Sequence, residues 1–414
     1  MKLKRYCLIL LFSCLTVLAK NQSRNLDFYL KEGLQNSPLL NDYRNQINSA
    51  ASDSLLIKAA KKPLIEAKSQ LQYSPVYDNF GYDEVKTDGG NYMAVMGVSQ
   101  KIFNKKELDN KYESVGLQRL ALDNSSTLSA NELNKLITDQ YLTAYSIYSD
   151  LLFNRKFLKL SHDENDIVAI FVKNGVCRLT DYLSLVLETQ SQDILVNQLD
   201  GQFRKEQLLL NKLCGLNDTV FYNLEEPHIE IRGMPDIVKS PEFIQYKIDS
   251  MRIENEKAAI DLRYKPKVNW FADAGFLTST PWNFYQHFGY SAGISLNFPV
   301  YDGKQKVIEK QKLEFNENSR RNYEESFRKQ YFQQIQQLYE ELKTLNKTSE
   351  QTEIQLATSD QLVRALKDQL EKGIIQMTEY INAIKNFRAI NRNLILVDIR
   401  KLQVINDMNY LLTR

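Results

Sequence analysis

The two halves of this sequence carry the same signals in the same order, and this repetition constrains the fold more than any other feature. The first matched pairs are 203 residues apart and the later ones 198 apart, so the first copy has one insertion of five residues. Constant spacing over such lengths indicates a tandem duplication rather than chance similarity between helices. The matched pairs are Ser37-Pro38 with Ser240-Pro241, Pro63 with Pro266, Tyr92 with Tyr290, Gly175 with Gly373, and Thr180 with Thr378.

The duplication divides the chain into a leader, two repeats and a joint. The first repeat covers residues 20–214 and the second covers residues 240–414. Residues 215–239, which contain two prolines and two glycines, read as the joint between them. In each repeat a Ser-Pro pair predicts the start of a helix, since serine caps a helix and proline suits its first turn.

Residues 1–19 are typical of an export signal peptide. Basic residues are followed by an apolar run that is too short for a spanning helix, and the segment ends at Ala19. We expect cleavage after Ala19, which changes the net charge from +2 to −1 because three basic residues are removed. Lipidation of Cys14 is the alternative. The remaining charges are interspersed, which does not favour nucleic acid as a partner.

Each repeat contains two segments in which apolar and polar residues alternate. These segments are residues 65–73 and 91–101 in the first repeat, and 267–277 and 287–299 in the second. Alternation predicts strands with one apolar and one polar face. A length of about 10 residues suits a tilted strand that crosses a bilayer. A half-buried soluble hairpin is the alternative, and the export signal favours the membrane.

Four strands cannot close a barrel alone, because single-chain barrels begin at eight strands and an open edge in lipid leaves backbone groups unpaired. If the strands cross a membrane, two chains would supply eight strands and three would supply twelve, with room for an open pore. The polar residues of the strands would then face the lumen. The lumen candidates are Glu66, Lys68, Gln70, Ser291 and Ser295.

Long helical hairpins are predicted after the second strand of each repeat, over residues 105–214 and 304–414. Residues 304–372 contain neither glycine nor proline, and as a helix they would extend about 100 Å. Gly175 and Gly373 are expected to end the outgoing helices. Thr180 and Thr378 are expected to cap the return helices. The helices carry charges throughout, so they should project into an aqueous compartment.

The ordered set of features resembles the TolC-like outer-membrane efflux protein family. The duplicated unit of helix, two strands, long helix and return helix matches, and so does the Ser-Pro to Lys-Pro spacing. Two further segments support the resemblance, Leu296-Asn297-Phe298-Pro299-Val300-Tyr301-Asp302-Gly303 after the fourth strand and Gly373-Ile374-Ile375-Gln376-Met377-Thr378-Glu379-Tyr380 at a helix tip.

The resemblance implies a mainly α-helical chain with a small transmembrane β part. It implies a homotrimer that forms a 12-stranded β-barrel in the outer membrane and an α-helical barrel in the periplasm, with the joint as an equatorial region. The implied partners are outer-membrane lipid, a periplasmic adaptor protein and an inner-membrane transporter. The implied function is an exit duct for small molecules or proteins. A periplasmic coiled-coil scaffold without pore activity is the alternative.

The family also suggests residues for the periplasmic end. Family members carry acidic residues at the entrance, and the matching positions are Glu379, which keeps a carboxylate, and Asn382, which does not. Asp181 is the repeat equivalent of Glu379. Both acids also lie where a helix dipole favours negative charge, so a lumen ring and simple capping remain alternatives. The positions that would contact an adaptor are Gly175, Thr180, Gly373 and Thr378.

No catalytic or metal-binding motif is found in the sequence. It contains no Gly-x-Ser-x-Gly, His-Glu-x-x-His, Walker or Cys-x-x-Cys pattern, and its three histidines are scattered. We therefore expect no enzyme activity, no cofactor and no metal site. Cys177 and Cys214 do not make a disulfide framework, although a single bridge between them is conceivable from sequence.

Overall fold

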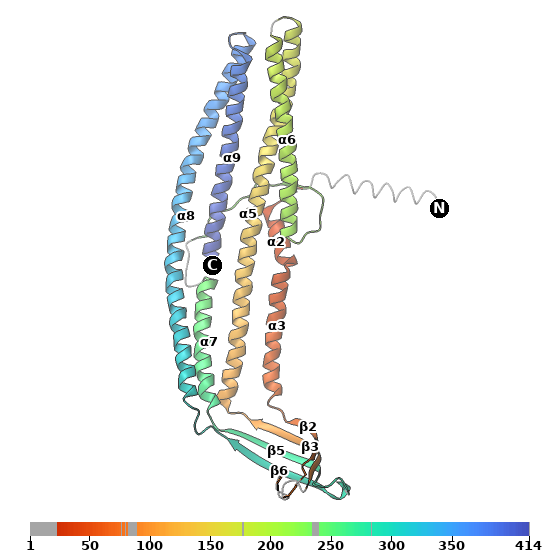
Figure 1. The fold of residues 1–414 in the computed structure, drawn as a ribbon. Helices are drawn as coiled ribbons and strands as arrows, with labels where there is room; N and C mark the ends of the chain where they lie inside the picture. Colours follow the sequence, from red (N-terminus) through yellow and green to blue (C-terminus); the bar gives the residue numbers. More distant parts are fainter. Residues whose placement is uncertain are drawn as a thin grey trace, which may run out of the picture. The chain divides into compact units, whose positions relative to one another are not determined.

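The computed structural model describes residues 23–75, 77–78, 80–81, 89–175, 178–233, 240–282 and 284–413 (Figure 1). The expected signal peptide, its cleavage site after Ala19, the alternative lipidation site Cys14 and the potential bridge residue Cys177 all lie outside these residues. The chain forms two compact units that do not follow the repeats. One contains residues 1–42, 126–242 and 326–414, and the other residues 43–125 and 243–325.

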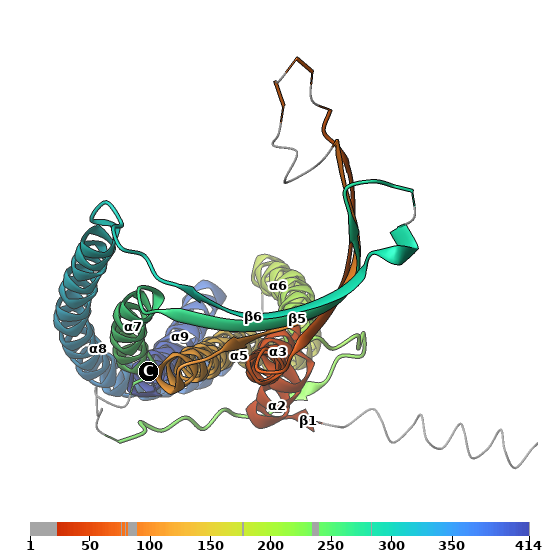
Figure 2. The same ribbon diagram turned by 90° about the horizontal axis from the view of Figure 1, so that it is seen from below.

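The unit of residues 43–125 and 243–325 contains a four-stranded antiparallel sheet. Its strands are β2 (Leu64–Tyr73), β3 (Gly90–Ile102), β5 (Lys267–Thr278) and β6 (Phe288–Asn297), in the order β2-β3-β5-β6. Each repeat supplies one hairpin, and β3 pairs with β5 where the two repeats meet. Figure 2 shows the sheet as a curved layer, as expected from the twist of long strands.

Helices continue from both ends of the strands. The first repeat has α3 (Pro38–Ala59) before its strands and α5 (Lys105–Lys173) after them, and the second has α7 (Pro241–Arg263) and α8 (Gln305–Glu371). At the start of α3 the Leu40 N–H donates to Ser37 Oγ over 3.4 Å, so serine caps this helix as its sequence indicates. A short 3₁₀ helix, η3 (Phe284–Gln286), lies between β5 and β6.

The other unit is built from helical hairpins. Hairpin 1 comprises α5 residues 126–173 and α6 (Leu179–Leu213), and hairpin 2 comprises α8 residues 326–371 and α9 (Met377–Thr413). The short helix α2 (Leu26–Asn36) and two-residue strands β1 (Ser23–Arg24) and β4 (Asn223–Leu224) pack beside hairpin 1. The sequence patterns had not indicated α2, β1 or β4.

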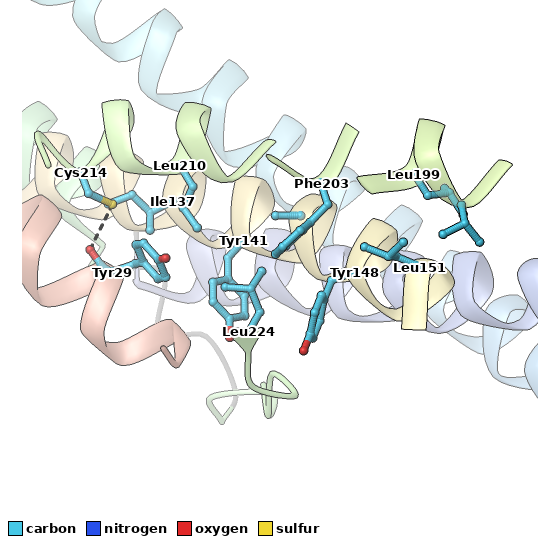
Figure 3. Packing of buried hydrophobic residues seen from close by; sticks show 12 residues of the cluster. Tyr29, Ile137, Tyr141, Tyr148, Leu151, Leu199, Phe203, Leu210, Cys214 and Leu224 are labelled. Atoms are coloured by element: carbon cyan, nitrogen blue, oxygen red, sulfur yellow. Dashed lines mark hydrogen bonds between the residues drawn. The ribbon is translucent and has the colours of Figure 1, made fainter. Parts of the chain in front are cut away.

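The largest buried cluster joins these short elements to hairpin 1 (Figure 3). Tyr29 of α2 and Tyr141 of α5 are fully buried, with ring centroids 5.8 Å apart. The Tyr141 hydroxyl donates to the carbonyl oxygens of Arg24 and Glu225 at 3.1 and 2.7 Å. Cys214 is also buried, and burial raises the pKa of its thiol to about 12. This thiol is therefore an inert packing group.

Glycine ends both outgoing helices, because Gly175 and Gly373 have φ angles of 71° and 69°. At the second tip, Gly373 N–H donates to Leu370 O and Ile374 N–H donates to Gln369 O, each at 2.9 Å. This pair of hydrogen bonds is the Schellman ending of a helix. The capping roles expected of Thr180 and Thr378 are wrong, because α9 begins at Met377 and α6 at Leu179, so each threonine lies inside its helix. The N-cap of α6 is Arg178, which makes no side-chain cap, and Thr180 lies inside the first turn.

The structure confirms the order of elements that the duplication predicts. The first repeat reads α3, β2, β3, α5, α6 and the second reads α7, β5, β6, α8, α9. The long helices end at Lys173 and Glu371, and the return helices begin at Leu179 and Met377, in each case 198 residues apart. The repeat spacing read from the sequence is therefore also the structural spacing at the tips.

Candidate functional site

The strand register divides the sheet into one polar and one apolar face. Glu66 lies opposite Gly97, Gly97 opposite Asp273, and Asp273 opposite Ser291, so these residues share a face. Because side chains alternate between the two faces along each strand, every second residue from these four lies on the same face. All five lumen candidates are among them, and we call this face the polar face. They are Glu66, Lys68, Gln70, Ser291 and Ser295.

Polar contacts run across this face. Ser291 Oγ donates to both carboxylate oxygens of Asp273 at 2.9 Å, between neighbouring strands. Lys68 Nζ lies 3.6 Å from Glu66 Oε2 along β2. The face also includes Phe271, whose ring lies over Gly293, where an added Cβ would be 2.6 Å from the ring. The glycine thus makes room for one aromatic ring on this face, which also carries the apolar side chains of Met93, Val95 and Leu277.

The opposite face is apolar and aromatic. Phe284 of η3 packs on Phe276 of this face, with ring centroids 5.3 Å apart, and many of its other large side chains are exposed. Tyr290, Leu71 and Ile294 have 89%, 80% and 76% of their side-chain surface exposed. A contiguous exposed apolar face of this kind marks contact with lipid or with another chain. The large exposed residues of this face are Ile65, Leu71, Tyr73, Met96, Ile102, Phe288, Tyr290, Ile294 and Leu296.

Both edges of the sheet are open in the described chain. β2 and β6 are the outer strands, and each has a single strand partner there. The sheet therefore offers two rows of backbone donors and acceptors that a second chain can pair with.

The entrance candidates lie at the first turns of the return helices. Asp181 N–H donates to Arg178 O and Glu379 N–H donates to Gln376 O, each at 3.1 Å, so the two tips have matching geometry. Glu379 and Asn382 are exposed and Asp181 is half-buried. The tip candidates Gly175, Thr180, Gly373 and Thr378 are all exposed. The two carboxylates thus stand at equivalent places on the two hairpins.

Ion pairs join the two hairpins behind these tips, and sequence reasoning missed them. Glu188 of α6 contacts Lys385 Nζ and Arg388 Nη1 of α9, both at 2.9 Å. Burial lowers the pKa of Arg388, and the Glu188 carboxylate opposes this effect. Glu188 and Arg388 are 200 residues apart in the sequence, so no local pattern predicts that they meet. The only signal in the sequence is that one hairpin carries an acid and the other carries bases.

A second contact joins the hairpins nearer the tips. Glu164 of α5 binds Lys367 Nζ of α8 at 2.9 Å and accepts a hydrogen bond of 2.8 Å from the Tyr380 hydroxyl. Burial raises the pKa of Tyr380, and the neighbouring Glu164 carboxylate adds to this effect. Tyr380 therefore stays a neutral donor, and the three groups hold hairpin 1 against hairpin 2.

Asp150 of α5 extends this interface. It accepts a hydrogen bond of 2.7 Å from Asn154 and lies 3.6 Å from Arg392 of α9. Burial raises the pKa of the Asp150 carboxyl, and Arg392 and Asn154 oppose the rise.

The described residues offer neither a membrane-spanning helix nor a metal-binding cluster. No helix there is both long and apolar enough to span a bilayer. Within the same residues, no cluster of three or more His, Cys, Asp or Glu side chains could hold a metal ion.

No protein-family model matches the sequence, and no curated protein matches it either. Solved structures do match the fold. CusC, described for its folding and transmembrane channel formation, gives a TM-score of 0.74 at 13% identity, over 93% of this chain and 91% of that one. The outer membrane protein VceC of Vibrio cholerae gives 0.73 at 13% identity, over 94% and 96%. The MtrE outer membrane channel of Neisseria gonorrhoeae, in its open state, gives 0.72 at 11%, over 94% and 88%.

The chain is similar to these proteins over nearly its whole length and theirs. It therefore has the TolC-like fold that its repeated pattern predicts, and the predicted fold class is confirmed. The single chain presents one open sheet with two free edges in its described part.

Proposed function

We propose that this protein is an outer-membrane channel that serves as the exit duct of an efflux or secretion system. The observation that carries the proposal is the register of the sheet, which gathers the polar candidates on one face and leaves the opposite face almost entirely apolar. Such a sheet suits a barrel wall between lipid and a wet lumen. The fold shared with outer-membrane channels supports the same conclusion.

The assembled form is a homotrimer. In hydrocarbon the free edges of β2 and β6 would leave backbone groups unpaired, so each edge pairs with a neighbouring chain. Three sheets of four strands give the 12 strands of an open barrel, and the helical hairpins continue the duct into the periplasm as a second barrel. The protein is then passive: it acts on no bond and lowers the barrier to crossing the outer membrane.

Energy and selectivity come from partners. We infer a periplasmic adaptor that contacts the tips near Gly175, Thr180, Gly373 and Thr378, and an inner-membrane transporter that supplies the cargo. The polar face offers Glu66, Lys68, Gln70, Ser291 and Ser295, a mixture of both charges and neutral groups, which suits a permissive lumen rather than a selective binding site.

The periplasmic entrance carries Glu379 and Asp181, with Asn382 one turn further along α9. Three chains bring six carboxylates to this end. Asn382 contributes no charge, so cation binding at the entrance is weaker than in a channel with two acids per return helix.

A planar-bilayer recording tests the channel. Protein purified in detergent should have the mass of three chains and should insert stepwise as open pores. The alternative, a periplasmic scaffold, would be recovered from the cell without detergent and would leave the bilayer silent. That result would remove the proposed function.

The entrance residues have a separate test. Asp181→Ala combined with Glu379→Ala should weaken block by divalent cations severalfold, because the carboxylates of the ring are gone. Asp193→Ala, an exposed acid further along α6, is the matched control and should leave block unchanged. Identical titrations for all three proteins would restrict the two tip acids to helix capping.

A further inference from the structure

The four junctions between the helices and the sheet are basic. Each junction contains two lysines, and Asp302 is the one acid in all four. The junctions are residues 60–63, 103–106, 264–267 and 298–306 (Figure 1). The loops at the opposite end of the strands, residues 74–89 and 279–287, contain one lysine and four acids. The two ends of the sheet therefore carry charges of opposite sign.

Two of these junctions enclose a cavity of about 260 Å³. It lies where β3 leads into α5 and where α7 leads into β5, so both repeats contribute to it. The basic residues of its lining are Lys101, Lys265 and Lys267, and its apolar residues include Ile102, Phe103 and Val268. The lining therefore combines positive charge with apolar surface.

The lysines of the cavity outnumber its acids. Glu107, the one acid in the lining, binds Lys101 Nζ at 2.6 Å, and it is shared with Lys111 at 3.4 Å. Lys265 and Lys267 are exposed, and neither makes an ion pair within the described part of the chain. Two positive charges at the cavity are therefore left without a counter-charge.

The apolar part of the cavity belongs to the face of the sheet that contacts lipid in the proposed channel. Ile102 lies opposite Val268 in the pairing of β3 with β5, and both are on the apolar face. They stand at the strand ends that lead into the helices, where the hydrocarbon of the membrane gives way to water. A lysine at this level extends its charged group toward the headgroups while its stem stays beside apolar surface. The cavity thus lies at the boundary between acyl chains and headgroups.

We propose that this cavity binds an anionic phospholipid from the leaflet on the helical side of the membrane. The phosphate lies between Lys265 and Lys267, and the first part of an acyl chain lies against Ile102 and Val268. Basic pockets at the level of the headgroups bind anionic lipids in this way. The inference rests on the proposed function, because it requires the apolar face to be in lipid.

The lining favours this ligand over two simpler ones. A free phosphate would use the lysines alone and leave the apolar residues against water. A zwitterionic phospholipid carries its own cation, which the unpaired Lys265 and Lys267 would repel. A lipid with a net negative charge matches both parts of the lining.

One of the two tryptophans of the chain reports on the cavity. Trp270 is two residues beyond Val268 in β5 and therefore lies on the same face, whereas Trp282 lies in the loop at the other end of the strands. All proteins in the test carry Trp282→Phe, so that the fluorescence comes from Trp270. They are placed in phosphatidylcholine vesicles that contain increasing fractions of phosphatidylglycerol with brominated acyl chains. Bromine quenches tryptophan on contact, and brominated phosphatidylcholine is the comparison lipid.

The titrations should show a severalfold higher apparent affinity for phosphatidylglycerol than for phosphatidylcholine. Lys265→Gln combined with Lys267→Gln should abolish this preference, and Lys265→Arg combined with Lys267→Arg should retain it because the charges remain. Lys31→Gln combined with Lys347→Gln is the matched control. It removes the same charge from exposed positions on α2 and α8, and it should keep the preference of the wild type. The trimeric fraction in detergent shows that each variant is assembled.

The outcomes separate this inference from the function proposed above. Equal quenching by the two lipids, a preference that survives the double glutamine variant, or a preference that the control variant also loses overturns the lipid site and leaves the channel intact. Inorganic phosphate that removes the extra quenching would assign the cavity to a small anion and would also overturn the lipid site. Trp270 that neither brominated lipid quenches would mean that the apolar face is not in lipid, which overturns both proposals.

Discussion

Among single residues, Gly275 must be a glycine because another backbone approaches it closely. The alternation of apolar and polar residues does not predict this requirement. A Cβ at this position would lie 2.2 Å from the Ala94 carbonyl oxygen and 2.6 Å from the Val95 Cα. A Cβ placed at its cross-strand neighbour Gly289 would have no atom within 4 Å. Both glycines are on the polar face of adjacent strands, but another backbone approaches only Gly275 closely.

We therefore expect Gly275→Ala to disturb the pairing of β3 with β5 and Gly289→Ala to leave it intact. The extra methyl group meets backbone atoms, which cannot rotate away as a side chain can, and overpacking of this kind costs about 1–3 kcal/mol. The yield of folded trimer after extraction, with its thermal stability, measures the effect. Equal stability of the two variants would contradict the close approach of β3 to residue 275.

For single residues, the sequence predicts which face of the sheet a side chain lies on better than it predicts which residue that side chain contacts. Alternation was sufficient to assign Glu66 and Ser291 to the polar side, because side chains alternate with period two whatever the strands pair with. It could not predict the Ser291 contact with Asp273, which depends on register. The same holds for Glu188 and Arg388, because they meet through the packing of two helices from different repeats.

Among the secondary-structure elements, α8 contains a charge network of its own near the sheet. Glu317 binds Arg320 and Arg321 at 2.8 Å, and Arg320 also binds Glu324 at 2.7 Å. The Arg320 hydrogen bond, aided by Arg321, lowers the pKa of Glu317 to about 2. Its side chain is only 11% exposed, so screening by water is limited.

Glu317→Gln should destabilise the helix in a pH-dependent way. A lowered carboxyl pKa contributes stability that is present above the ordinary value of 4.5 and is lost as the pH falls through about 2. The variant should therefore be less stable at pH 7, by up to about 3 kcal/mol, and the difference should shrink in acid. Thermal loss of helical circular dichroism in detergent measures it. Glu314→Gln, an exposed acid on the same helix, should show no such trend. A deficit of constant size across pH would rule out the ionised carboxylate as its cause.

The predicted helix boundaries agree with the structure where a glycine or proline sets them. They disagree where a cap was inferred from the position of a threonine alone. Gly373 ends α8 because its left-handed backbone closes the last turn. Thr180 does not cap α6, because the helix begins one residue earlier, at Leu179. The short helix α2 was not predicted, although Asn25 caps it by accepting a hydrogen bond from the Phe28 N–H.

The open sheet edges give the prediction that belongs to the whole molecule. Leu277 N–H donates to His287 O, and these two residues lie opposite each other in the register of β5 with β6. Hydrogen-bonded pairs alternate along antiparallel strands, so the N–H of Ala292, five residues on, is directed away from β5. Ala292→Pro should therefore spare the sheet of one chain and block pairing with the next.

The expected result for Ala292→Pro is folded protein with the mass of one chain in detergent, without channel activity. Ala292→Val keeps the N–H and suits a strand, so it should remain trimeric and conduct ions. Light scattering of the detergent-solubilised protein distinguishes the two states. A proline variant that still assembles would mean that β6 is not the edge shared between chains.

The pairing of β1 with β4 bears on the order in which the chain acquires its structure. Ser23 lies beside Asn223 and Arg24 beside Leu224, so the partners are 200 residues apart. Closing so large a loop is entropically expensive and comes late. During vectorial synthesis, any nascent fragment that stops before residue 225 lacks the carbonyl group that accepts the shorter of the two Tyr141 hydrogen bonds. β1 therefore has no strand partner until more than half of the chain has emerged.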